Sequence, residues 1–108
     1  MMRMMMKVSI PVDTGNAAMR DGSFGPKIQQ ILTELKPEAA YFVEEDGLRT
    51  AILFFEMKDS SELPGVAEPW FLTFNASISV RPAMTAADLA NAKPGIDHAV
   101  GGSSRHWA

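Results

Sequence analysis

Four short stretches of the chain have the hydrophobic pattern or the residue types of β-strands. In the first stretch, Met4, Met6, Val8 and Ile10 occupy every second position, and β-branched and aromatic residues are frequent in the others. Successive side chains of a β-strand point to opposite faces, so this period of two predicts strands with at least one buried face. We predict strands near residues 4–11, 39–45, 49–57 and 77–82.

The segments between these stretches have a helical period instead. Apolar residues recur at positions i, i+3, i+4 and i+7 in residues 28–35, and a second apolar stripe runs through residues 63–74. We therefore predict that residues 15–36 form one kinked helix or two short ones, ending before Pro37. Thr85 and Asp88 form a capping-box pattern, which predicts a short helix after the last strand.

The element order is βαββαβ, which is the order of the ferredoxin-like fold. Asp46 and Gly47 are typical hairpin-turn residues and join the second and third strands. We expect an α+β domain over residues 1–93, with a four-stranded antiparallel sheet in the order 4-1-3-2 and helices on one face. Residues 94–108, rich in glycine and small polar residues and containing His98 and His106, are expected to form a flexible tail.

The third predicted strand is apolar on both of its faces over residues 51–55. Two helices can cover only one face of the sheet. The other face would expose an apolar patch that monomeric proteins seldom tolerate. We therefore predict a homodimer joined through the open sheet face, that is, a dimeric α+β barrel.

Charge and composition exclude several functional classes. Ten Lys and Arg residues against thirteen Asp and Glu give a net charge of −3, which does not favour nucleic acid as a partner. The chain lacks cysteine, and its two histidines do not have zinc-site spacing, so we expect no metal site and no tightly held cofactor. No apolar run approaches a membrane span or a signal-peptide core, so we expect no membrane partner and a cytoplasmic location.

Several local segments resemble a known group of proteins. They are residues 37–42, Asp46-Gly47, residues 49–51, residues 67–69 with Asn75-Ala76, and residues 81–89. Together they are similar to uncharacterised small bacterial proteins of the dimeric α+β barrel superfamily, over about residues 5–92. The resemblance implies the fold and the dimer. It implies no catalytic residue, because no catalytic motif of the wider superfamily maps onto this chain.

The candidate site consists of polar and aromatic side chains on the face of the sheet away from the helices. Parity within each strand places there Lys7, Ser9, Phe54, Glu56, Ser79 and Arg81, and Tyr41 is a candidate proton donor. We expect Lys7, Glu56 and Arg81 to lie close enough for at least one ion pair. Two buried cations beside one carboxylate would favour an anionic ligand, whereas solvated groups would form only a weak surface ion pair.

Three functions remain open from the sequence. The chain could bind a small polar or anionic molecule in the barrel cleft. It could instead be a cofactor-independent enzyme of the monooxygenase or isomerase kind, with barrel-facing residues as acid or base. The third alternative is a non-catalytic interaction module.

Overall fold

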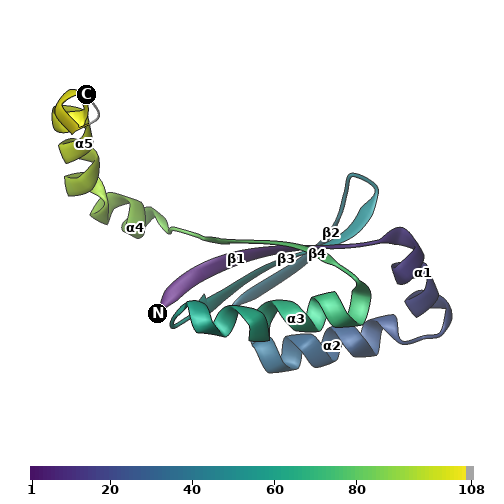
Figure 1. Ribbon diagram of the computed structural model, residues 1–108. Coiled ribbons are helices and arrows are strands. Elements are labelled where there is room, and N and C mark those ends of the chain that lie inside the picture. Colours follow the sequence, from purple (N-terminus) through teal and green to yellow (C-terminus); the bar gives the residue numbers. More distant parts are fainter. Residues whose placement is uncertain (107–108) are drawn as a thin grey trace.

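One antiparallel sheet forms the centre of the molecule (Figure 1). The computed structural model describes residues 1–106, and their side chains as far as residue 102. The strands are β1 (Met2–Ile10), β2 (Ala39–Glu45), β3 (Leu48–Met57) and β4 (Ser77–Pro82). They are arranged in the order β2-β3-β1-β4, and every neighbouring pair is antiparallel. The predicted ferredoxin-like α+β fold and its strand order are therefore confirmed.

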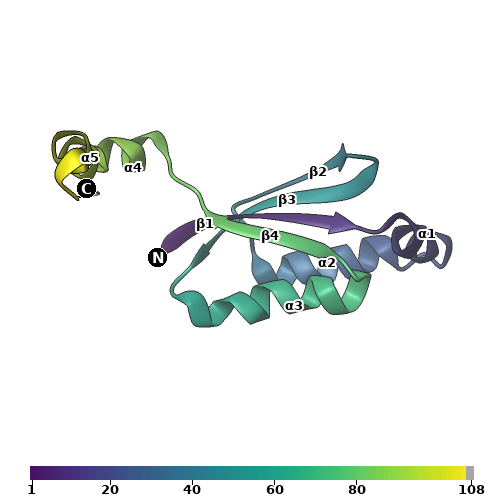
Figure 2. The ribbon, with the colours of Figure 1, turned by 45° about the horizontal axis from the view of Figure 1, so that its top comes forward.

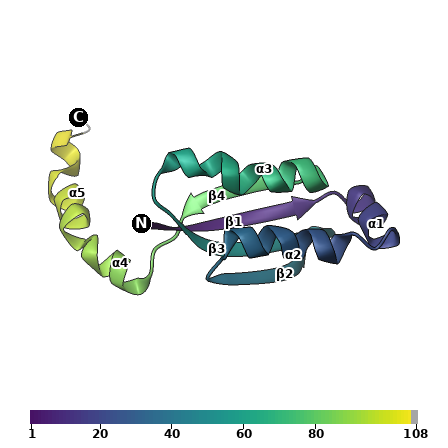
Figure 3. The same cartoon turned by 90° about the horizontal axis from the view of Figure 1, so that it is seen from below.

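The helices between the strands pack on a single face of this sheet. Figure 3 looks onto that face, where the two long helices run along the strands. The elements are α1 (Val12–Arg20), α2 (Phe24–Leu35), the 3-10 turn η1 (Ser60–Glu62) and α3 (Leu63–Phe74). Of the two forms expected for residues 15–36, the structure has two short helices. The chain turns between them at Gly22, whose φ of 80° falls in the left-handed region that glycine readily adopts.

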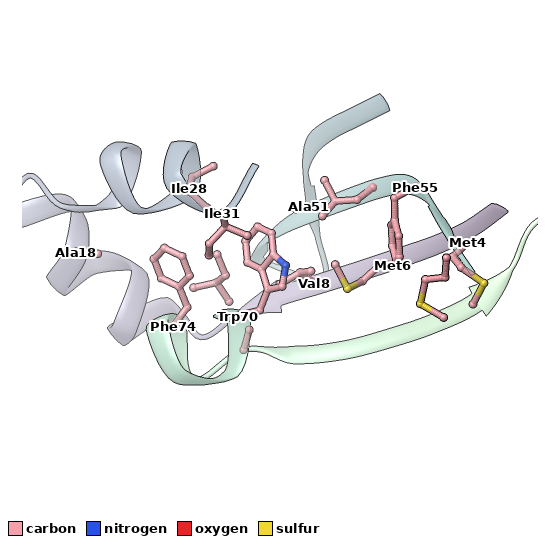
Figure 4. Close-up of a cluster of buried hydrophobic side chains, with 14 residues drawn as sticks. Met4, Met6, Val8, Ala18, Ile28, Ile31, Ala51, Phe55, Trp70 and Phe74 are labelled. Atoms are coloured by element: carbon pink, nitrogen blue, oxygen red, sulfur yellow. The ribbon is translucent and has the colours of Figure 1, made fainter. Parts of the chain in front are cut away.

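The hydrophobic core lies between the sheet and α2 and α3 (Figure 4). Alternate residues of the two central strands point into it, and all eight are at most 5% exposed: Met4, Met6, Val8, Ile10, Ala51, Leu53, Phe55 and Met57. Trp70 and Phe74 of α3 cover them and are fully buried. Burying an apolar side chain of this size contributes about 1.5–3 kcal/mol. Strand parity thus fixes which face of β1 and β3 receives the helices.

The β2–β3 connection is the tight hairpin expected from Asp46 and Gly47. Both residues have positive φ, 54° and 79°, as a type I′ turn requires. The carboxylate of Glu44 accepts a hydrogen bond from the backbone N–H of Gly47 at 2.7 Å. The turn therefore holds this carboxylate close to the tip of the hairpin.

The chain after β4 forms two helices, and the second differs from the sequence-based expectation. Helix α4 (Ala86–Asn91) begins with the predicted capping box between Thr85 and Asp88. Residues 94–108 were expected to form a tail, but helix α5 (Lys93–His106) continues from α4. Pro94 occupies the first turn, where its missing N–H costs no hydrogen bond, and Lys93 pairs with Asp97 at 2.6 Å one turn later. The side chain of His106 and residues 107–108 lie outside the described part of the chain.

Both C-terminal helices lie away from the sheet. In Figures 1 and 2 they extend beyond its end, on the side opposite to α2 and α3. The molecule is consequently elongated, with a radius of gyration of 18.0 Å. A compact domain of this length has a radius of gyration of about 13 Å.

Replacing Trp70 with alanine tests how much of the stability comes from the contact between α3 and the sheet. Trp70 is fully buried, so Trp70→Ala should lower the free energy of unfolding by about 3–5 kcal/mol. The same truncation at Leu72, which is 79% exposed on the same helix, should cost about 0.5 kcal/mol or less. Urea denaturation of both variants measures the difference, and equal losses would contradict this assignment of the core.

Candidate functional site

The site residues predicted from the sequence do share the open face of the sheet. The strand register places Lys7 opposite Ile52 of β3 and Ser79 of β4. Arg81 stands opposite Met5, and Glu56 opposite Arg3. Residues directly opposite each other in an antiparallel ladder point to the same face, so the parity argument holds for all three charges. The other members of the set, Ser9, Tyr41 and Phe54, occupy the same face.

The structure does not bring these charges together, and the expected ion pair within the set is wrong. The Nζ atom of Lys7 lies 2.7 Å from Glu45 of β2 instead. Arg81 donates to the hydroxyl of Ser79 at 2.7 Å. Glu56 is four residues along β3 from Ile52, the partner of Lys7, which separates the two by about 13 Å along the strand.

The members of the predicted set also differ in solvent exposure and in the residues that surround them. Glu56 and Arg81 are solvent-exposed, and the Lys7 side chain is 38% exposed. Glu56 borders a cavity of about 240 Å³ that also involves Glu34 of α2 and Glu62 of η1. Tyr41 is 59% exposed on the edge strand. In the single chain, the polar groups of the predicted set are therefore scattered over the open face.

A larger cavity lies on the other face of the sheet, beside the hairpin. Its volume is about 560 Å³, within the range of small-molecule sites. Its lining comes from α1, the start of α2, the end of β1 and the β2–β3 hairpin, and consists of Ile10, Val12, Asn16, Met19, Phe24, Ile28, Phe42, Val43, Glu44, Gly47, Leu48, Arg49, Thr50 and Ala51. Most of these residues are apolar.

The cavity exists because the helices leave the edge strand partly uncovered. The register pairs Phe42 with Ala51, so Phe42 points to the helix-covered face, yet it remains 55% exposed. Helix α1 follows β1 directly and presents Val12, Asn16 and Met19 to the space beside it at helical spacing. Phe24, at the start of α2, adds an aromatic wall. The result is a hollow between α1 and the hairpin.

Arg49 is the cation of this cavity and is held in place by three contacts. It occupies the helix-facing register of β3, two residues before the buried Ala51. Its Nη2 atom donates to the side-chain oxygen of Asn16 at 3.0 Å, and its Nη1 atom approaches the backbone oxygen of Val12 at 3.5 Å. The guanidinium carbon lies 5.9 Å from the centre of the Phe24 ring, within the range of a cation–π contact.

Gly15 provides the space that the guanidinium occupies. A Cβ atom at this buried position of α1 would lie 2.5 Å from Nη1 of Arg49. No real side chain tolerates that distance, so any residue larger than glycine must displace the guanidinium. Gly15 and Asn16 therefore act together to set the position of Arg49.

The charge of Arg49 is not neutralised by a direct ion pair. Glu44 stands opposite Arg49 in the ladder, but its carboxylate accepts the hydrogen bond from Gly47 in the turn. No carboxylate among the described side chains lies within 4 Å of the Arg49 guanidinium. A guanidinium has five N–H donors arranged to meet a carboxylate with two parallel hydrogen bonds. Arg49 thus retains donors for an anion that enters the cavity.

The carboxyl groups with shifted pKa values lie elsewhere. Hydrogen bonds from Ser23 and Ser61 lower the pKa of Asp21 and Asp59, and the backbone N–H of Thr85 lowers the pKa of Asp88. The guanidinium of Arg3 lowers the pKa of Glu38 by a charge-assisted hydrogen bond. Each of these carboxylates holds a turn, a cap or a surface pair, and none of them lines the 560 Å³ cavity.

Sequence reasoning missed Arg49, although the signal was present. The apolar residues of its strand that face the helices are Ala51, Leu53, Phe55 and Met57. Extending the same register backwards places Arg49 on that face. A charged residue in an apolar register requires a local partner or solvent, and this could have marked it. The roles of Gly15, Asn16 and Phe24 depend on how α1 and α2 pack, which the sequence pattern does not specify.

Comparison with known proteins adds no family assignment. No family model matches the chain, and a search of curated proteins finds no significant match. Over residues 1–106, no helix has the length and apolar character needed to cross a membrane. Within the same part of the chain, no three His, Cys, Asp or Glu side chains are grouped so as to hold a metal ion. The geometry of the cavity is therefore the main guide to function.

Substituting Gly15 tests how tightly Arg49 is positioned. Gly15→Ala should push the guanidinium away from Asn16, because the new Cβ and Nη1 would overlap. Gly25→Ala is the matched control, since a Cβ there meets nothing within 4 Å. Nitrogen-15 NMR of the arginine side chain should show the Arg49 Nε–H signal shifted in Gly15→Ala and unchanged in Gly25→Ala. An unshifted signal in both variants would show that Gly15 does not set the position of Arg49.

Proposed function

We propose that this protein binds a small organic anion with an apolar body in the cavity beside the hairpin. The observation that carries the proposal is Arg49, a half-buried cation at the wall of a mainly apolar 560 Å³ cavity, held by Asn16 and Phe24 and without a carboxylate within 4 Å among the described side chains. Ligand sites typically combine apolar walls with a few positioned polar groups.

The lining favours a monocarboxylate over a more highly charged ligand. Arg49 can bind one carboxylate with paired hydrogen bonds, while Ile10, Met19 and Ile28 offer apolar surface for the rest of the molecule. Glu44 lines the same cavity and would repel a second negative group. Phenylpropanoate, with one carboxylate and one aromatic ring, is a suitable probe.

Replacing Arg49 should abolish most of this binding. The Arg49→Gln variant should raise the dissociation constant for phenylpropanoate by about tenfold or more, because a charged hydrogen-bond pair contributes about 1.5–3 kcal/mol. The neutral phenylpropanamide should bind weakly to both proteins. Arg20→Gln is the control, since Arg20 is an exposed arginine outside the cavity lining. Titrations followed by protein NMR measure each of these affinities, and equal effects at positions 20 and 49 would contradict the assigned site.

The proposed ligand class agrees with the sequence-based expectation, but its location differs. The sequence-based prediction located the anion on the open face, beside Lys7 and Arg81. Lys7 has its carboxylate partner in Glu45, and Arg81 is exposed, so these groups offer less to a ligand than Arg49 does. The titratable groups with shifted pKa values lie outside the cavity, so no specific observation favours the enzyme alternative over binding.

The homodimer through the open face is a second part of the proposal. Ile52 and Phe54 are half-buried on this face, flanked by the exposed Tyr41 and Val43. The neighbouring Met5 adds to this apolar surface, and no helix in Figure 1 covers it. Pairing two such faces would remove the surface from water and form the dimeric α+β barrel that the sequence resemblance implies.

Sedimentation of the purified chain tests the dimer directly. At micromolar concentration the mass should be about twice that of one chain, and the Phe54→Glu variant should sediment as a monomer because a buried, unpaired charge opposes association. Glu68→Gln, an exposed change on α3, serves as the control for altered charge. A monomeric wild-type chain would refute the dimer while leaving the Arg49 cavity as a binding site in each chain.

A further inference from the structure

Residues 83–106, the last described segment of the chain, form an arm that projects away from the sheet domain (Figure 1). It consists of a short extended linker followed by α4 and α5. A backbone hydrogen bond from Ala83 to the carbonyl of Arg3, at 3.0 Å, fixes the start of the arm beside β1. Beyond that point, α4 and α5 extend away from the rest of the molecule (Figures 1 and 2).

The arm carries apolar side chains that its own chain leaves in solvent. Met84 in the linker is 67% exposed, Leu89 of α4 is 53% exposed, and Ile96 of α5 is 49% exposed. Helix α5 contains Gly95, Gly101 and Gly102, which are poor helix formers. A helix of 14 residues with such a composition is marginal in water unless tertiary contacts stabilise it. Contacts with a packing partner would therefore stabilise the helical conformation of the arm.

The chain has enough exposed area to supply one side of a protein interface. The chain exposes 7192 Å², whereas a compact monomer of 108 residues exposes roughly 5,900 Å². The excess of roughly 1,300 Å² exceeds the area that one partner contributes to a standard stable interface, about 800 Å². An interface of this size fits a second protein chain better than a small ligand.

We propose that the arm clasps a second copy of this chain, as a swapped element of the homodimer. The proposal rests on the dimer through the open face, to which it adds a second contact. The arm leaves the edge of the sheet on the side of the open face, so a second copy seated on that face lies next to it (Figure 1). By symmetry each arm packs on the other copy, and both uncovered surfaces of the chain are buried by the same partner.

Charge variants in the arm of the full chain test this proposal. Leu89→Glu and Ile96→Glu should each raise the dissociation constant of the dimer by about tenfold or more, because each places a charge in an apolar contact. Leu72→Glu is the matched control, since Leu72 is 79% exposed on α3, on the face away from the proposed interface. Sedimentation over a dilution series measures the three constants, and circular dichroism verifies that each variant is folded.

Hydrogen exchange provides a second readout. The amides of α5 should be protected at concentrations where the chain is dimeric and should lose that protection on dilution or in Phe54→Glu. If the dimer persists with unchanged affinity in both arm variants, the clasp is refuted and the sheet-to-sheet dimer stands. If the wild-type chain is monomeric, both are refuted. Protection of α5 that is independent of concentration would show that the arm packs on its own chain, which also refutes the clasp.

Discussion

The strict alternation of side chains in the two central strands controls the rest of this structure. In β1 and β3, alternate residues from Met4 to Ile10 and from Ala51 to Met57 are buried in the core under the helices, and the residues between them face the other side of the sheet. Because both strands are central, a slip of one residue would expose the whole core and bury Lys7 and Glu56. The fold is therefore tightly specified along β1 and β3, and less so at the edges, where β2 and the C-terminal arm have fewer partners.

The same constraint explains where the cavity forms. Two helices cover the central strands, but the edge strand β2 extends past them, and Phe42 remains exposed on the helix side. Helix α1 turns in at the end of β1 and leaves a hollow in front of the hairpin. Arg49 belongs to the set of alternate β3 residues that face the helices, and it lies at the end of this set that borders the hollow. Its guanidinium can therefore be held by the protein and still reach a ligand, which is what a preorganised anion site requires.

The two proposed features use opposite faces of the sheet and so do not compete for surface. A second copy on the open face would leave the Arg49 cavity free on the helix side of each chain. The hairpin connects the two, since Tyr41 points to the open face while its neighbour Phe42 points to the helix-covered face and lines the cavity. Association on one face can thus restrict the motion of the strand that forms the wall of the cavity on the other.

The sequence by itself determined the four strands, the hairpin turn and the face on which each strand residue lies. These features depend on local periodicity and turn chemistry, which act over a few residues. It also placed Lys7, Glu56 and Arg81 correctly on one face. It could not pair them, because pairing depends on distance along the ladder and on Glu45 of a neighbouring strand. The helical form of residues 93–106 was missed because glycine content alone does not exclude a helix. Only the tertiary structure decided that Gly15, Asn16 and Phe24 meet at Arg49, because that contact depends on how α1 and α2 pack against β3.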